Sequence, residues 1–205
     1  MPKPSKAAVS RVVRKPAPVK GWSSEFSLAE APPDTAIIMD NFFPESDALR
    51  ARRGTTIQST GLGASVDSIL AYTSQTGGHK LFGATSANIY DCTSIGAVGA
   101  AVVAGTANGR WQQEMFSTAG GQFLVICNGQ DGVRNFDGAA WTNPTAGITG
   151  TGVTSTSFIQ VCAHKQRLWF VQQNSTTLAY LGTSSITGAA LQFPVGAYLK
   201  MGGKV

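Results

Sequence analysis

The chain has 205 residues, of which 42% are hydrophobic and 13% are charged, and its formal net charge at pH 7 is +5. This apolar content is enough for a folded core and excludes a wholly disordered chain. The charged fraction is about half of the roughly 25% that is usual in soluble proteins, so Ser, Thr, Asn, Gln and Gly must cover much of the surface. Short Val, Ile, Phe and Tyr runs between such residues predict an all-β protein rather than a helical bundle.

Residues 1–20 combine six basic residues with no acid and with four prolines. Proline removes a backbone donor and fixes φ, so most of this stretch cannot form a regular element. We therefore predict an extended basic arm that stays disordered or lies along a neighbour. An anionic surface such as nucleic acid is the alternative contact, because closely spaced phosphates attract many cations at once.

Residues 21–60 form a lead-in segment that mixes aromatic residues with turn residues and has no clean period. Its apolar side chains include Trp22, Phe42 and Phe43. Because such side chains are not left in water, we expect the segment to pack on the main domain or on a neighbouring subunit.

Residues 61–205 contain a repeat, and this repeat is the main signal in the chain. It is seen in HKLFGATSANIYDCTS from residue 79, GQFLVICNGQDGVRNFDGAAW from 121 and KQRLWFVQQNSTTLAYLGTSS from 165. Leu81, Leu124 and Leu168 lie 43 and 44 residues apart, and the closing aromatic residues Tyr90, Phe136 and Tyr180 lie 46 and 44 apart. The pattern predicts three or four short antiparallel strands per unit, which is typical of β-propeller blades.

About three such blades are present, and this number has a physical consequence. A propeller closes with roughly four to eight blades, so an arc of three leaves two blade faces bare. We expect either that more chain follows Val205 or that neighbouring subunits cover those faces. A β-sandwich or a tandem of small barrels is the alternative fold.

Signatures of catalysis and of ligand binding are weak. The chain has no P-loop, HExxH, paired CxxC or G-x-S-x-G motif, so we predict that it is not an enzyme and carries no cofactor or metal. His79 and His164 precede corresponding strands, which favours a structural role. The Asn-Gly and Asp-Gly steps at 128–132 indicate a hairpin turn rather than a cation loop.

The cysteine and tryptophan residues also give expectations. Cys92, Cys127 and Cys162 are odd in number and lie in or beside strand-like runs, which predicts buried free thiols. Trp111, Trp141 and Trp169 could be exposed and stack on sugars. Our preferred interpretation places Trp169 in the core and Trp141 at a blade edge. No run of about 18 apolar residues predicts a membrane span, and the first 20 residues lack the apolar stretch of a secretory signal.

Several motifs together resemble a known family. They are I-Y-D-x-T at 89–93, N-G-R-W at 108–111, N-G-x-D-G followed by F-D-G-x-x-W at 128–141, H-K-x-R-L-W-F at 164–170 and a final F-P-x-G from 193. Over roughly residues 35–203 the chain is similar to the N-terminal part of the tail nozzle or tail-tube proteins of short-tailed bacteriophages. The resemblance implies a virion tail protein, assembled in the host cytoplasm, whose propeller-like subunits form a hexameric tube below the head-to-tail adaptor.

The resemblance also implies partners. Six copies would surround a lumen that DNA crosses only transiently, next to adaptor or portal proteins and to tail fibres or spikes. Residues 54–205 carry a net charge of only +2, which suits such a conduit because a strongly cationic wall would retain phosphates. The subunit-interface candidates are basic or aromatic residues of the arm and the lead-in: Lys3, Lys6, Arg11, Arg14, Lys15, Arg50, Arg52, Arg53, Trp22, Phe42 and Phe43.

Three other functions stay open. A receptor-binding or fibre-attachment tail protein would gather aromatic and polar residues on one loop face. A lectin-like carbohydrate-binding propeller would need carboxylates that converge in a pocket. A nucleic-acid binder would depend on the basic arm for a salt-sensitive affinity.

Overall fold

A computed structural model describes residues 16–27, 29–142 and 147–198. The chain divides into two compact units, residues 1–56 and residues 57–205. Most of the arm predicted for residues 1–20 lies outside the described residues. The described ranges contain strands and two short 3₁₀ turns, η2 (Ser155–Ser157) and η3 (Val195–Ala197), and in them no helix is long and apolar enough to cross a membrane. The predicted all-β class is therefore confirmed.

The N-terminal unit contains one small hairpin. Strand β1 (Phe42–Pro44) pairs antiparallel with β2 (Leu49–Ala51), which places Phe43 opposite Arg50. Upstream, an isolated bridge joins Trp22 to Ala36.

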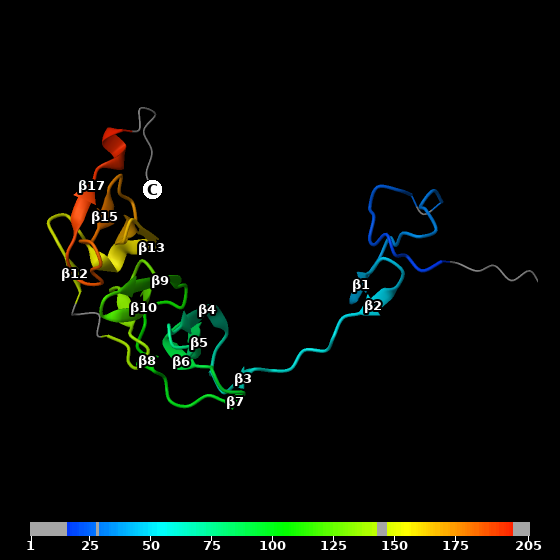
Figure 1. Cartoon of the computed structure of the whole chain (residues 1–205), viewed down its shortest axis with the longest axis horizontal. Coiled ribbons are helices and arrows are strands. Elements are labelled where there is room, and N and C mark those ends of the chain that lie inside the picture. The colour runs from blue at the N-terminus through cyan, green and yellow to red at the C-terminus, as the bar shows by residue number, and fades with distance from the viewer. Residues whose placement is uncertain (1–15, 28, 143–146, 199–205) are drawn as a thin grey trace, which may run out of the picture. The chain divides into compact units, whose positions relative to one another are not determined.

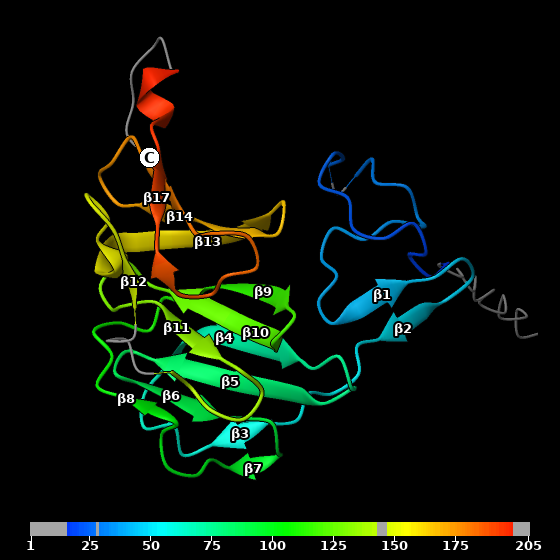
Figure 2. The same cartoon turned by 60° about the vertical axis from the view of Figure 1, so that its left-hand side comes forward.

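The C-terminal unit is built from three antiparallel sheets. The first sheet has the order β4 (Val66–Thr73), β5 (His79–Thr85), β6 (Asn88–Asp91) and β8 (Val103–Ala104). The middle sheet has β9 (Gln112–Thr118), β10 (Gly121–Cys127) and β11 (Arg134–Phe136). The third sheet has β13 (Phe158–His164), β14 (Arg167–Gln172), β15 (Leu178–Tyr180) and β17 (Leu191–Phe193). The strands of each sheet lie side by side in chain order, and the three sheets follow one another through the unit (Figures 1 and 2).

Two short parallel pairs strengthen the likeness between the first and third sheets. Strand β3 (Ser59–Thr60), which precedes β4, pairs with β7 (Gly96–Ala97), and β12 (Ile148–Thr149), which precedes β13, pairs with β16 (Gly188–Ala189). In both cases the partner strand follows the third strand and precedes the fourth strand of the sheet along the chain. The repeat predicted from the sequence is thus present in the strand pairing.

Local sequence explains the tight turns. Lys165 and Gln166 join β13 to β14, and both have positive φ, 49° and 55°. A two-residue hairpin turn with positive φ at both positions matches the twist of the strands. At the end of β10, Asn128 Oδ1 accepts hydrogen bonds from the backbone N–H groups of Gln130 and Asp131, at 3.0 and 2.7 Å. The segment 128–132 is therefore a turn, as predicted.

The strand register corrects one part of the predicted repeat. Leu81, Leu124 and Leu168 pair with Cys92, Phe136 and Leu181, which lie 44 and 45 residues apart. Tyr180 instead pairs with Trp169, one residue out of phase, so its side chain points to the opposite face of its sheet. The alignment of the leucines is right, whereas the alignment of Tyr90 and Tyr180 with Phe136 is wrong.

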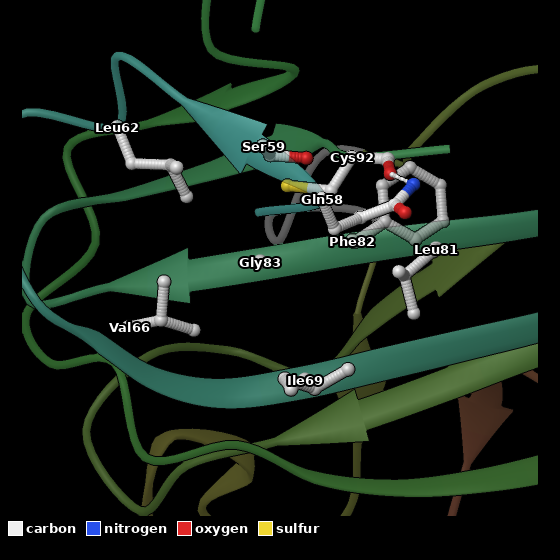
Figure 3. A pocket seen from close by; sticks show the side chains of 9 residues that line it. All are labelled: Gln58, Ser59, Leu62, Val66, Ile69, Leu81, Phe82, Gly83 and Cys92. Atoms are coloured by element: carbon white, nitrogen blue, oxygen red, sulfur yellow. Dashed lines mark hydrogen bonds between the residues drawn. The ribbon is translucent and has the colours of Figure 1, made fainter. Parts of the chain in front are cut away.

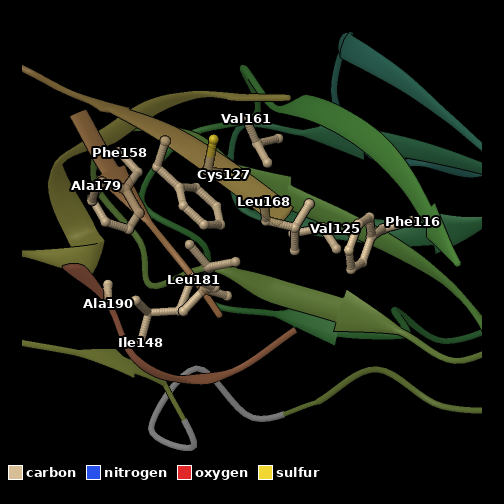
Figure 4. Packing of buried hydrophobic residues seen from close by; sticks show 12 residues of the cluster. Phe116, Val125, Cys127, Ile148, Phe158, Val161, Leu168, Ala179, Leu181 and Ala190 are labelled. Atoms are coloured by element: carbon tan, nitrogen blue, oxygen red, sulfur yellow. The ribbon is translucent and has the colours of Figure 1, made fainter. Parts of the chain in front are cut away.

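The middle sheet lies between two hydrophobic cores. On β10, Leu124 and Ile126 pack in the cluster shared with the first sheet, which also holds Leu70, Tyr72, Phe82, Ala84, Ile89, Val103, Trp111 and Phe136. Val125 and Cys127 point the other way, into the cluster shared with the third sheet, where Phe158, Leu168, Phe170 and Leu181 are buried (Figure 4). Because neighbouring strand residues face opposite sides, one strand serves both cores.

The structure corrects two expectations: Trp111 was expected to be exposed, and Cys162 was expected to be buried. Trp111 is buried, at 4% exposure, because its side chain enters the core of the first and middle sheets, and its backbone N–H donates to Ser68 Oγ at 3.0 Å. Cys162 is exposed, because it follows the core residue Val161 on β13 and so faces outward, whereas Cys92 and Cys127 are buried as predicted.

Candidate functional site

The candidate site lies on the outer faces of the two end sheets of the C-terminal unit. Both faces of the middle sheet are covered, but the first and third sheets each have one face directed away from it. We call the outer face of the first sheet, with Leu81, Gly83 and Cys92, the leading face. We call the outer face of the third sheet, with Trp169, Tyr180 and Phe193, the trailing face.

The leading face carries an apolar hollow of about 240 Å³ (Figure 3). Its walls come from β3, β4, β5 and the segments beside them, and the lining residues are Gln58, Ser59, Leu62, Val66, Ile69, Leu81, Phe82, Gly83 and Cys92. No charged residue is among them. Ile69 is 66% exposed, although it lies on the same strand as the fully buried Leu70.

Glycine forms part of the floor of this hollow. A Cβ at Gly83 would lie 3.1 Å from both Cys92 Sγ and Leu62 Cδ2. The amide of Gln58 donates to the backbone oxygen of Cys92 at 3.2 Å, which ties the segment before β3 to the end of β6. The absence of a side chain at Gly83 thus lets Leu62 and Cys92 lie close to the floor, and the Gln58 bond fixes the wall beside it.

The trailing face is aromatic. The ring of Trp169 stacks on that of Tyr180 with centroids 4.6 Å apart, and Phe193 contacts Trp169 edge-on at 6.1 Å. Tyr198 extends the row by stacking on Phe193 at 5.5 Å. Trp169 was predicted to be a core residue, but the structure places it on this outer face, only partly buried.

Basic side chains border one end of the aromatic row. The guanidinium carbon of Arg167 lies 5.5 Å from the centre of the Tyr180 ring, a cation–π contact. Arg167, Lys165 and His164 line a hollow of about 270 Å³ together with Trp169, Tyr180 and Phe193. This end of the trailing face is therefore both aromatic and cationic.

The predicted interface residues lie elsewhere, in the N-terminal unit. Phe42 and Phe43 are about half exposed on β1, and the Nε of Arg50 pairs with Glu45 Oε1 at 3.1 Å. Trp22 is 64% exposed, and its indole N–H donates to the backbone oxygen of Ile37 at 2.7 Å. Arg52 and Arg53 are exposed. The structure thus brings Phe42, Phe43 and Arg50 together on one hairpin, while Lys3, Lys6, Arg11, Arg14 and Lys15 lie outside the described residues.

Three of the carboxylates after residue 53 are engaged in separate parts of the C-terminal unit rather than gathered. Asp91 pairs with Lys80 Nζ at 2.8 Å, Asp131 accepts from Asn128 Nδ2 at 2.6 Å, and Glu114 accepts from the backbone N–H of Ala163 at 3.2 Å. Burial raises the pKa of Asp91, but hydrogen bonds from Lys80 and Thr93 outweigh it and leave that pKa below its ordinary value. Within residues 16–27, 29–142 and 147–198, no three His, Cys, Asp or Glu side chains are placed to hold a metal ion.

Sequence reasoning anticipated two bare faces but did not name their residues. A usable signal exists in the repeat, because residues at equivalent positions of the middle and third sheets identify which side of each strand is internal. Comparison of the chain with family models, with curated proteins and with solved structures finds no match in any of the three.

Proposed function

We propose that this chain is a structural protein of a phage tail and forms part of a hexameric nozzle or tube, below the head-to-tail adaptor, through which DNA is ejected. The observation that supports it most is the pair of apolar outer faces at the two ends of a repeated sheet stack, which carry exposed side chains such as Ile69 and Phe193. Exposed large apolar side chains that gather on one face are typical of protein–protein contact. The motif resemblance supplies the tail context.

In this proposal the sheets act as propeller-like blades. The first and third sheets each have four antiparallel strands that neighbour one another in chain order, as blades do. The role is mechanical: copies join to enclose a lumen, and the low charge of residues 54–205 limits retention of DNA on the wall.

The test is assembly with candidate partners. The full chain is purified with candidate adaptor and portal proteins and imaged by electron microscopy. Rings of six copies stacked on the adaptor are expected, and a stable monomer that ignores the adaptor would contradict the proposal.

A second experiment addresses the basic arm. Deletion of residues 1–20 should weaken assembly if Lys3, Lys6, Arg11, Arg14 and Lys15 lie at a subunit junction. Unchanged assembly would remove that role from the arm. A salt-sensitive loss of DNA binding after the same deletion would favour the nucleic-acid alternative.

One observation favours a second candidate, a carbohydrate-binding protein. The Trp169 and Tyr180 rings lie beside Arg167 in an open hollow, and aromatic faces stack on sugars. Glycan-array binding that Trp169→Ala abolishes would support this candidate. Absence of binding together with ring assembly would exclude it.

A further inference from the structure

We propose that a second copy of this chain docks head to tail on the first, with the leading face of one copy against the trailing face of the next. The inference rests on the proposed function only in that both require self-association, and it specifies which surfaces meet. A contact between two different faces of identical copies closes into a ring or continues as a filament. With three sheets per chain and closure at roughly four to eight sheets, two copies joined in this way are enough to close, so a six-copy nozzle would need a second contact besides this one.

The chain already contains this interface twice. The first sheet meets the middle sheet through the face that carries Phe82, and the middle sheet meets the third through the face that carries Val125. By strand register, the equivalent residue of the third sheet is Trp169, on the trailing face. The leading face is likewise equivalent to the buried faces that carry Leu124 and Leu168. The leading face thus corresponds to one side of the internal contact between neighbouring sheets, and the trailing face corresponds to the other side.

The two halves are complementary in size. Gly83 on the leading face stands where the middle and third sheets carry Ile126 and Phe170. Leu62 and Cys92 of the same chain approach to 3.1 Å of the position that a Cβ would take, so the hollow is the room that remains beyond these two side chains. Cys92 likewise stands where the other two sheets carry Phe136 and Leu181.

The trailing face shows the opposite deviation, because Trp169 is larger than the equivalent Val125. Within the chain, Phe82 packs on Phe136 with ring centroids 5.0 Å apart. The equivalent contact between copies places Trp169 of one copy over Cys92 of the next, in the hollow of about 240 Å³.

Surface chemistry favours another protein face over a sugar or a nucleic acid at the leading face. Its hollow is lined by two polar side chains, Gln58 and Ser59, and by no charged one. Sugars need several directed hydrogen bonds, and nucleic acids need cations, whereas an aromatic row needs only apolar cover. The trailing face provides such a row in this same chain.

The test uses one charged substitution on each face. Ile69→Glu alters the leading face and Phe193→Glu alters the trailing face, and both positions are exposed, at 66% and 40%, so the fold should tolerate the changes. Ile38→Glu is the matched control, because Ile38 is 77% exposed and belongs to the N-terminal unit. Circular dichroism verifies folding, and sedimentation velocity with native mass spectrometry measures association of the full chain.

Wild type and Ile38→Glu should associate, and each face variant alone should associate at least about tenfold more weakly. A 1:1 mixture of the two face variants should form heterodimers, because Ile69→Glu retains its trailing face and Phe193→Glu retains its leading face. The proposal is overturned by a monomeric wild type, by a face variant that associates like wild type, or by a mixture that fails to form heterodimers.

The copy number separates this inference from the proposed function. A wild-type assembly of six copies, lost in both face variants, supports both. An assembly of another size that is lost in both variants supports the head-to-tail contact and counts against the hexameric nozzle. Six-copy rings that persist in both variants support the nozzle and overturn the contact.

Discussion

Replacement of Phe136 by alanine should strongly destabilise the C-terminal unit. Phe136 is 3% exposed, and its ring lies between those of Tyr72, Phe82 and Trp141 at centroid distances of 5.1, 5.0 and 5.2 Å. Truncation of a buried Phe costs about 3–5 kcal/mol, because the lost burial is joined by an incompletely filled cavity. For a unit of this size, about 2–4 °C per kcal/mol gives a fall in Tm of about 6–20 °C.

The measurement is urea and thermal unfolding followed by tryptophan fluorescence, in an Ile69→Glu background that suppresses self-association. Phe42→Ala is the control, because Phe42 is half exposed and belongs to the other unit. It should change the unfolding free energy of the C-terminal unit by less than about 0.5 kcal/mol. A cost below about 1.5 kcal/mol for Phe136→Ala, or equal costs for the two variants, would show that this cluster does not hold the sheets together.

Hydrogen exchange provides a second readout of the same change. Phe136 belongs to the core of the first and middle sheets and not to that of the middle and third. In a stack of repeated units each unit contacts only its neighbours, so the loss is expected to be local. Amides of β4, β5 and β6 should lose more protection than those of β14 and β15. Uniform loss over the three sheets would instead indicate a single cooperative unit.

Three further changes test other parts of the structure. In the Ile69→Glu background, which suppresses self-association, Ellman's reagent should modify Cys162, which is exposed opposite Trp169 on the trailing face. Cys127, where burial raises the pKa to about 12, should react only on unfolding, and peptide mapping that finds early Cys127 modification would contradict its burial. Backbone N–H bonds lower the pKa of Asp137, so its contribution is present above about pH 5 and is lost as pH falls through the lowered folded pKa. Asp137→Asn should cost about 0.5 kcal/mol at pH 7, a small value because the side chain is exposed, and coincident stability curves of variant and wild type from pH 3 to 7 would refute this. Gly109→Ala would place Cβ 2.5 Å from the backbone oxygen of Thr85 and should cost about 1–3 kcal/mol of stability. Gly99→Ala is the control, because a Cβ there meets nothing within 4 Å. Equal melting temperatures of the two variants would show that the close approach at Gly109 is unimportant.

Spacing along the chain predicted the repeat, because each sheet needs a similar length of chain for its strands and turns. Leu81, Leu124 and Leu168 occupy equivalent positions in the second strands of the three sheets, as their spacing predicted. The long loop between β10 and β11 and the tight turn at Lys165 and Gln166 alter the loop lengths but not the order in which the strands pair. Strand content was therefore readable from the sequence.

The side of the sheet to which each side chain points was much harder to predict, because a shift of one residue in the register moves every side chain of the strand to the opposite face. Tyr180 looks like the counterpart of Phe136, yet Leu181 occupies that position. Cys162 lies beside the core residue Val161 but points outward, and the bulge between Phe158 and Gln160 adds a local irregularity to that strand. A short apolar run contains no marker of such a shift, so these errors follow from the period of two.

The residues of the two end faces could not be identified from the sequence, for a related reason. Trp169, Tyr180 and Phe193 are as apolar as core residues, so composition cannot separate a face that a partner covers from one that the chain covers itself. Equivalent positions separate them better: two sheets place Phe136 and Leu181 against an internal neighbour, while the first places the smaller Cys92 at the edge of an open hollow. The two end faces deviate from their internal counterparts in opposite directions, with Cys92 smaller and Trp169 larger, so a contact between them would bring the larger side chain to the smaller one.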